Sequence, residues 1–162
     1  MDDKPIIQRA FPMLCGENPH ILILGTFPSP LSRKNGEYYA NPRNQFWRLI
    51  FGIFNEPFND PVYEKKKAVL FNNAIALCDV VLECEPEGAL DTGIRNPVYN
   101  TDLPMLIAEH KISRVFFNGN NAYLYYHRGI GEIERQVLPS SSPANARIGF
   151  EEKLRLWSEL LN

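Results

Sequence analysis

The stretch ILILGTFPSPLSRKNGEYYANPRNQFW, residues 21–47, decides the fold. It begins with four consecutive aliphatic residues and a glycine, a run that is typical of a buried strand in a parallel sheet. The two prolines of the FPSP segment prevent a helix from starting at once. Asn44 then precedes an amphipathic segment, 45–55, and is a suitable N-cap for a helix. A polar and aromatic loop therefore joins a buried strand to a helix, which is where ligands bind in open α/β sheets.

Strand and helix patterns alternate along the rest of the chain. Apolar segments predict three further strands at 74–82, 114–119 and 133–138. Helices are predicted at 62–71, 102–110 (capped by Thr101), 122–127 and 150–161, the last with Phe150, Leu154, Trp157 and Leu161 on one face. Residues 1–19 and 83–101 are expected to be irregular. This alternation predicts an α/β fold in which helices cover both faces of a parallel sheet, with residues 1–162 forming one domain.

Composition excludes several classes of protein. The 162 residues are 44% hydrophobic and 22% charged, as in an ordinary globular domain, and no apolar run is long enough to span a bilayer. The N-terminal MDDKPIIQRAFP lacks the basic and apolar regions of a signal peptide, so we expect a cytoplasmic protein without membrane contacts. Three cysteines without a CxxC pair and three scattered histidines predict neither a disulfide framework nor a metal site.

The charge distribution leaves two interpretations open. A net charge of −2 does not predict nucleic-acid binding by the molecule as a whole. Residues 30–50, however, contain four basic side chains and one acid, whereas residues 51–110 contain ten acids and four bases. A basic loop on an acidic body fits a small phosphate footprint, and it also fits an ordinary solvated loop.

Polar residues follow three of the predicted strands. They occur in the loop after the first strand, in Asn118-Gly119, and in the serine run 140–142. Because the carboxyl ends of parallel strands meet at one edge of a sheet, these loops can line one cleft. Amides, hydroxyls and aromatic rings suit a planar, hydrogen-bonding ligand such as a base. Taken singly, each also has an ordinary structural explanation: Asn44 as a helix cap, Tyr39 as packing, the serines as a turn.

Four sequence motifs point to a known protein family, which the spacing of apolar and polar residues does not identify by itself. The segments LILGTFPS…YYANPRNQFW, ALCDVV…GALDTGI, FFNGNNA and LPSSSPANA follow one another along nearly the whole chain. Together they resemble the uracil-DNA glycosylase superfamily, and within it the hypoxanthine-DNA (deoxyinosine) glycosylases. The resemblance implies a three-layer α/β/α sandwich with a central four-stranded parallel sheet. It also implies a monofunctional glycosylase, acting as a monomer without metal or cofactor, that excises a deaminated base from DNA.

The resemblance also implies roles for individual residues. Phe27 stands where a related branch has its water-positioning Asn, and Asn44 is expected to take over that catalytic role. Tyr39, with Phe27, is expected to stack on the flipped base, and Asn118 to read its edge. The last motif is expected to grip the DNA backbone through five residues, Ser140, Ser141, Ser142, Pro143 and Asn145.

Other activities stay open at the level of sequence. The runner-up substrate is uracil, including uracil in a G:U mismatch. A catalytically inactive DNA-binding module of the same fold, or an enzyme acting on free nucleosides, would share much of the pattern. No GxGxxG or Walker A segment supports a dinucleotide or ATP site. Asp79, between apolar residues, is interpreted as a buried hydrogen-bonding residue, and Asp91 as a loop cap.

Overall fold

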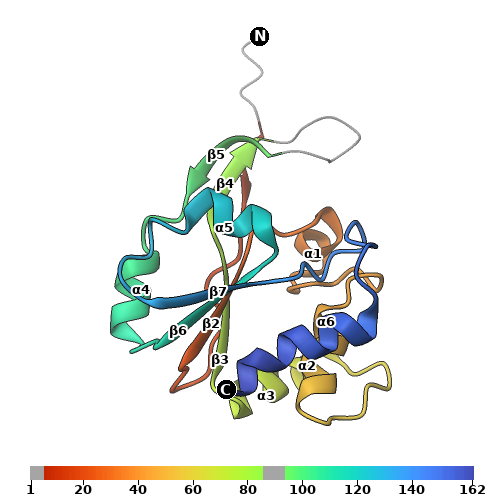
Figure 1. Ribbon diagram of the computed structural model, residues 1–162. Coiled ribbons are helices and arrows are strands. Elements are labelled where there is room, and N and C mark those ends of the chain that lie inside the picture. The colour runs from red at the N-terminus through yellow and green to blue at the C-terminus, as the bar shows by residue number, and fades with distance from the viewer. Residues whose placement is uncertain (1–5, 86–93) are drawn as a thin grey trace.

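A four-stranded parallel sheet forms the centre of the protein (Figure 1), whose structure is a computed structural model that describes residues 6–85 and 94–162. The strand order is β3-β2-β6-β7, and the strands are β2 (Ile21–Gly25), β3 (Ile75–Asp79), β6 (Arg114–Asn118) and β7 (Glu134–Leu138). Leu22 lies opposite Ala76 on one side and Val115 on the other, so β2 is paired along both edges. The four predicted strands and their parallel arrangement are therefore confirmed.

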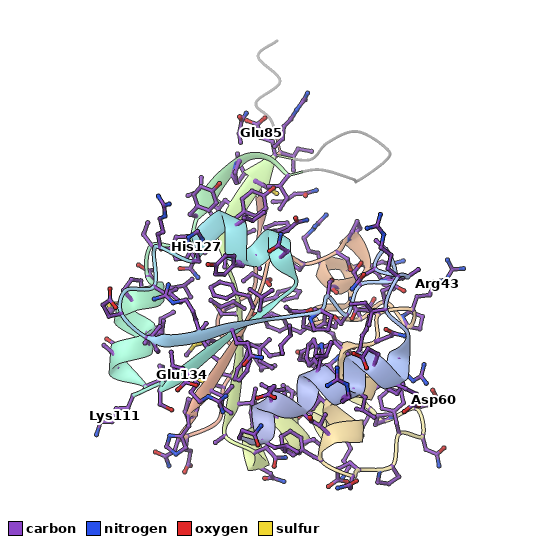
Figure 2. The ribbon with its side chains drawn as sticks, in the orientation of Figure 1. Arg43, Asp60, Glu85, Lys111, His127 and Glu134 are labelled. Atoms are coloured by element: carbon purple, nitrogen blue, oxygen red, sulfur yellow. The ribbon has the colours of Figure 1, made fainter. Side chains whose placement is uncertain are left out.

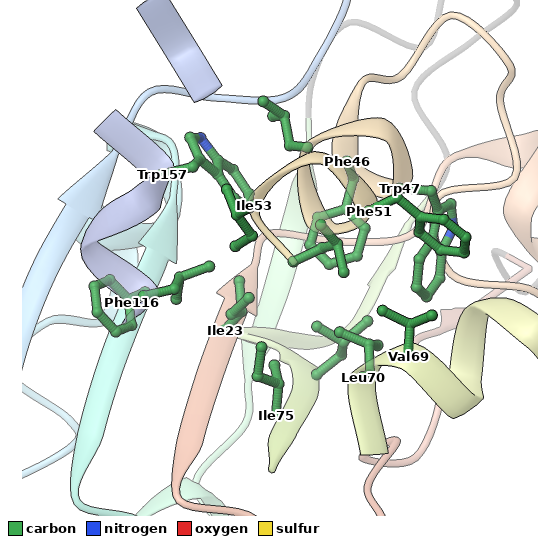
Figure 3. Close-up of a cluster of buried hydrophobic side chains, with 14 of the residues drawn as sticks. Ile23, Phe46, Trp47, Phe51, Ile53, Val69, Leu70, Ile75, Phe116 and Trp157 are labelled. Atoms are coloured by element: carbon green, nitrogen blue, oxygen red, sulfur yellow. The ribbon is translucent and has the colours of Figure 1, made fainter. Parts of the chain in front are cut away.

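Helices on one face of the sheet enclose the larger part of the core. They are α2 (Phe46–Ile53), α3 (Tyr63–Asn72), α6 (Phe150–Trp157) and the short 3-10 helix η1 (Ser158–Leu161). Figure 3 shows Ile23 and Phe116 of the sheet facing Phe46 and Trp157, and all four side chains are buried in one cluster. Burying such side chains contributes about 1.5–3 kcal/mol each, so this face supplies much of the stability that holds the strand ends in place.

Two helices, α4 (Leu103–Glu109) and α5 (Asn120–Tyr126), cover the opposite face. Leu22 and Leu24 of β2 point to this face and pack with Leu103 and Ala122. Ile23, which lies between them in the strand, points to the opposite face. The alternation follows from the period of two in a strand, which sends successive side chains to opposite faces. The three-layer α/β/α sandwich expected from the resemblance is confirmed.

The segment 74–82 is not one strand with a turn, as the sequence predicted. It divides at Val80 into β3 and β4 (Val81–Glu85), and β4 belongs to a second, antiparallel sheet of order β1-β4-β5. Its partners are β1 (Gln8–Arg9) and β5 (Arg95–Tyr99), which lie in segments predicted to be irregular. Figure 1 shows this small sheet beyond α5. The prediction failed because β1 is two residues long and β5 contains a proline, so neither carries a strand pattern.

Three local predictions are corrected. Pro30 begins α1 (Pro30–Asn35), because a proline fits the first helical position and Ser29 Oγ accepts the Ser32 N–H at 3.2 Å. Thr101 is not the N-cap of α4; the N-cap is Asp102, whose own N–H donates to Asn100 Oδ1 at 3.2 Å. Leu161 is 56% exposed and Leu160 is buried, since the chain tightens from α6 into η1 and rotates the apolar face by one residue.

Candidate functional site

A cleft of about 850 Å³ opens where the four parallel strands end. Each strand contributes its last residue to the lining, and these residues are Gly25, Asp79, Asn118 and Leu138. The loop after β2 and the serine loop after β7 complete the walls. The sequence predicted a cleft formed by three of these strand ends, and the structure adds the end of β3.

Tyr39 lines the cleft in a backbone conformation that side chains rarely adopt, with φ of 53°. Its ring stacks on Phe46 with centroids 4.0 Å apart and planes inclined by 18°. Its hydroxyl accepts a hydrogen bond from Asn118 Nδ2 at 3.0 Å. Burial, followed by the nearby Asp79, raises the pKa of Tyr39, so the phenol is neutral at physiological pH. Strained backbone held by packing is common where a side chain must be aimed at a ligand.

Asn118 joins the central sheet to the serine loop. Its Nδ2 also donates to Ser141 Oγ at 2.8 Å, and its Oδ1 accepts the Ser141 N–H at 2.9 Å. Both amide protons are therefore engaged, while Oδ1 retains one lone pair. Asn118 lines the cleft, and this lone pair is the hydrogen-bonding position of its side chain that no described residue uses.

The serine loop is held from both sides. Ser141 is fully buried, and its carbonyl accepts the Gln45 N–H at 2.9 Å. Lys153, itself 1% exposed, donates to Gln45 Oε1 at 2.9 Å and to the Asn145 carbonyl at 3.0 Å. The loop is thereby fixed against the start of α2 and against α6.

The serine-loop residues predicted to grip DNA do not all face the same way. Ser140, Ser142 and Asn145 line the cleft, together with Ala144 and Arg147. Ser141 points into the protein, and Pro143 is exposed outside the cleft lining. The loop therefore combines an internal anchor with a row of outward hydroxyl, amide and guanidinium groups.

Phe27 and Asn44 occupy different environments. Phe27 lines the cleft and also a neighbouring cavity of about 280 Å³, and the Arg33 guanidinium lies over its ring at 5.4 Å. Asn44 is outside the cleft lining; its Oδ1 accepts the Phe46 N–H at 2.9 Å, at the start of α2. The N-cap of α2 is Gln45 and not Asn44 as predicted, although the Asn44 side chain does accept the first N–H of the helix. The catalytic role of Asn44 stays a prediction.

Asp79, at the end of β3, is a cleft residue for which the sequence suggested no chemical role. It is 4% exposed, and burial raises its carboxyl pKa from 3.8 to about 7. Its Oδ2 is enclosed without a hydrogen-bond partner among the described residues. The sequence could have marked Asp79 as a cleft residue, because it ends an apolar strand just as Asn118 does. Asp91 lies outside the described residues.

The residues of 6–85 and 94–162 form no group of three or more His, Cys, Asp or Glu side chains that could hold a metal ion. Among the same residues, no helix has the length and apolar character needed to cross a bilayer. The chemical groups in the cleft lining are amides, hydroxyls, aromatic rings, one buried carboxyl and the Arg147 guanidinium.

A family model of the uracil DNA glycosylase superfamily matches residues 12–161, which include all four strands of the parallel sheet. The chain therefore belongs to the uracil DNA glycosylase superfamily, as the four motifs predicted. Two relatives narrow the class further. A Methanosarcina acetivorans protein named hypoxanthine DNA glycosylase is 41% identical over 144 residues, covering 88% of this chain and 90% of that protein. A Methanosarcina barkeri protein of the same name is 33% identical over 154 residues, covering 94% of this chain and 96% of that protein.

A solved structure is also similar over the full chain. It is a solution NMR structure of a Methanosarcina acetivorans protein described as a candidate uracil DNA glycosylase. The two folds agree with a TM-score of 0.78 at 37% identity, covering 97% of this chain and 100% of that one. The fold expected from the resemblance is thus found in a solved relative.

Proposed function

We propose that this protein is a monofunctional DNA glycosylase that excises hypoxanthine, the base of deoxyinosine, from DNA by hydrolysis. The observation that carries the proposal is the cleft at the carboxyl ends of the sheet, where Tyr39 and Asn118 lie within hydrogen-bonding distance of each other. The names of the two curated relatives support the same substrate. We further propose that residues 1–162 form one domain that acts as a monomer in the cytoplasm.

The target nucleotide leaves the base stack and enters the cleft. Extruding it costs about a few kcal/mol, less at a mispair, which favours damaged sites. The base stacks on Tyr39, whose ring Phe46 holds in place, and against Phe27. The free lone pair of Asn118 Oδ1 accepts an N–H of the base edge, and this contact selects bases that carry a donor there.

Cleavage of the C1′–N bond leaves positive charge on the sugar and electron density on the departing base. Fixed dipoles in the cleft, namely the Asn118 amide and nearby backbone N–H groups, stabilise that charge separation. Water then attacks C1′. Asn44 is our candidate for positioning this water, and it can do so only if residues 41–45 move when DNA binds, because Asn44 lies outside the cleft lining.

The DNA backbone is proposed to lie along the serine loop. The hydroxyls of Ser140 and Ser142, the Asn145 amide and the exposed Pro143 contact phosphates and sugar, while the buried Ser141 keeps the loop in register with Asn118. Hydroxyls and amides are common phosphate partners, and they fix position without reading sequence.

The test is base release from duplexes that carry a single deoxyinosine or a single deoxyuridine, with Asn44→Ala and Asn118→Ala beside the wild type. Release of hypoxanthine by the wild type supports the proposal. Loss of release in Asn44→Ala with duplex binding retained supports its role with water. Duplex binding without release of either base would show an inactive binding module instead, and cleavage of free deoxyinosine but not of duplex would show a nucleoside enzyme.

Uracil is the second candidate base, favoured by the description of the solved relative as a candidate uracil DNA glycosylase. Uracil also presents an N–H beside carbonyl oxygens, so Asn118 Oδ1 suits it as well. Release of uracil alone in the duplex experiment would assign this chain to that activity.

A further inference from the structure

The carboxyl group of Asp79 lies in the cleft, and one of its oxygens has no hydrogen-bond partner among the residues that the structure describes. Asp79 ends β3 and lines the cleft, yet only 4% of the residue is exposed. Its Oδ2 is enclosed and has no hydrogen-bond partner among the described residues. Buried polar side chains are nearly always hydrogen-bonded, so an unpaired carboxyl beside a ligand cleft needs a functional explanation.

The neighbouring residues leave space for this carboxyl and shield it. A Cβ on Gly25 would lie 2.6 Å from Asp79 Oδ1 and 2.8 Å from the Tyr39 hydroxyl, so only glycine fits here. The titratable groups that respond to Asp79 are Tyr38, Tyr39 and Cys78, whose pKa values it raises in each case after the larger effect of burial. All three are neutral at physiological pH, and Asn118, across the cleft floor, is uncharged.

No charged neighbour therefore sets the protonation of Asp79. Burial alone raises its pKa to about 7, so both the acid and the carboxylate are populated near neutral pH. A group poised in this way is suited to proton transfer, which is most efficient when the pKa lies near the working pH. Among the described residues that line the cleft, Asp79 is the only one whose side chain can donate a proton with a pKa near neutral pH.

We propose that Asp79 is the general acid that protonates hypoxanthine as it leaves. This inference rests on the function proposed above. The C1′–N9 bond breaks and its electron pair moves into the purine. A ring nitrogen of the purine, N7 or N3, takes the proton from the Asp79 carboxyl, so the base departs neutral. Water forms the new C1′–O bond, and the proton that it loses returns to the Asp79 carboxylate directly or through solvent. The products are an abasic site and hypoxanthine, with no other reactant.

This assignment separates hypoxanthine from uracil. Uracil has no unprotonated ring nitrogen to receive the proton and can leave as an anion stabilised by the Asn118 side of the cleft. Asp79 therefore gives a purine leaving group an assistance that a pyrimidine does not use. General acid catalysis contributes about 10²–10⁴-fold, and this is the loss expected when the acid is removed.

The experiment measures single-turnover base release from a deoxyinosine duplex between about pH 5 and 9 for wild type, Asp79→Asn and the control Asp60→Asn. Asp60 is exposed and lies at the edge of the molecule (Figure 2). The acid form is the active one, so the wild-type and control rates should be constant at low pH and fall tenfold per pH unit above the Asp79 pKa. Asp79→Asn should be about 10²–10⁴-fold slower at low pH, with no inflection near neutrality.

Duplexes carrying 7-deazahypoxanthine or 3-deazahypoxanthine identify the nitrogen that receives the proton. The ratio of wild-type to Asp79→Asn rates should fall to about one on the analogue that lacks it. These duplexes and the wild-type pH profile test the wild-type enzyme even if Asp79→Asn folds poorly, because the wild type should itself lose its pH dependence on that analogue.

Three results would overturn the inference. They are a wild-type rate that rises through neutral pH, an Asp79→Asn rate within about threefold of wild type, and an equal loss in Asp79→Asn on all three substrates. If the wild type releases no hypoxanthine at any pH, the proposed function fails and this inference falls with it. If the wild type releases hypoxanthine and any of the three results is found, the inference alone fails.

Discussion

At the scale of single residues, Asn118 organises the floor of the cleft through three hydrogen bonds to Tyr39 and Ser141. Asn118→Ala leaves a buried N–H and two hydroxyls without this partner, which costs about 1–3 kcal/mol for each group that water cannot reach. It also removes a dipole aimed at the departing base, so hypoxanthine release should fall by about 10²–10³-fold. Urea unfolding and single-turnover release measure the two effects.

Ser141→Ala separates these effects, since it removes one hydroxyl contact and leaves the Asn118 amide in place. Its stability should fall in the same direction as that of Asn118→Ala, while its rate stays close to wild type. Equal rates for the two variants would show that Asn118 acts only through the serine loop.

The buried carboxyl of Asp79 should make stability depend on pH. Its pKa is 3.8 ordinarily and about 7 in the folded protein, so the neutral form stabilises the fold fully below about pH 4. That stabilisation is lost as the pH rises through 7, by on the order of 4 kcal/mol. Asp79→Asn cannot ionise, so urea unfolding should find it more stable than wild type near pH 8 and similar near pH 4. If the free energies of unfolding of wild type and Asp79→Asn differ by the same amount at every pH, the raised pKa is contradicted.

Residue roles were the least predictable part of the site. Tyr39 and Asn118 could be placed from the sequence because a parallel sheet brings its strand ends together. Asp79 was read as a hydrogen-bonded core residue because the pattern shows burial without showing partners. Asn44 was predicted to act in the cleft but lies outside its lining. Its place depends on how α2 begins, which the sequence leaves undetermined to within a residue or two.

At the scale of elements, α6 acts on the site through Lys153. This buried side chain bridges Gln45, before α2, and Asn145, in the serine loop. Lys153→Met keeps the apolar stem but leaves two acceptors unpaired, so the free energy of unfolding should fall by about 1–3 kcal/mol. The loop should also open more readily, which hydrogen exchange of the Ser142 and Asn145 amides would detect.

Arg155→Met is a matched control on the same helix, because Arg155 is exposed and, among the described residues, its guanidinium pairs only with Glu152. Surface pairs of this kind contribute about 0–1 kcal/mol, so stability and loop exchange should change little. If both variants speed hydrogen exchange of the Ser142 and Asn145 amides equally, the loop is held by α6 as a whole and not by the Lys153 hydrogen bonds.

Elements were predictable where burial gives a periodic pattern. The strands β2, β3 and β6 and the helices α2 and α6 were found because each buries a continuous apolar face. The strand β7 and the helix α3 bury fewer side chains, namely Leu138 in β7 and Val69 and Leu70 in α3. The split at Val80 was missed because Val80 and Val81 are as apolar as β3 itself, so the change from the parallel to the antiparallel sheet leaves no mark on hydrophobicity. The small sheet depends on pairing across distant segments, which no local pattern reports.

At the scale of the whole molecule, a protein of net charge −2 must bind DNA through a local footprint. Two arginines are exposed near this end of the molecule: Arg147 is part of the cleft lining, and Arg43, in the segment before α2, projects outward at the edge of the molecule (Figure 2). The logarithm of the binding constant should therefore fall linearly with the logarithm of salt concentration, with a slope of about −0.9 per phosphate contact.

Arg147→Ala should reduce that slope by about one and weaken binding to damaged and undamaged duplexes alike, because a phosphate contact carries no base information. Fluorescence anisotropy at several salt concentrations measures both quantities. Lys111→Asn is the matched control: Lys111 lies before the start of β6, at the edge of the sheet opposite the cleft, and its φ of 55° suits asparagine. Its slope should equal that of wild type. An equal reduction of the slope and of the binding constant in both variants would mean that DNA binding depends on the overall charge of the protein and not on contacts at the cleft.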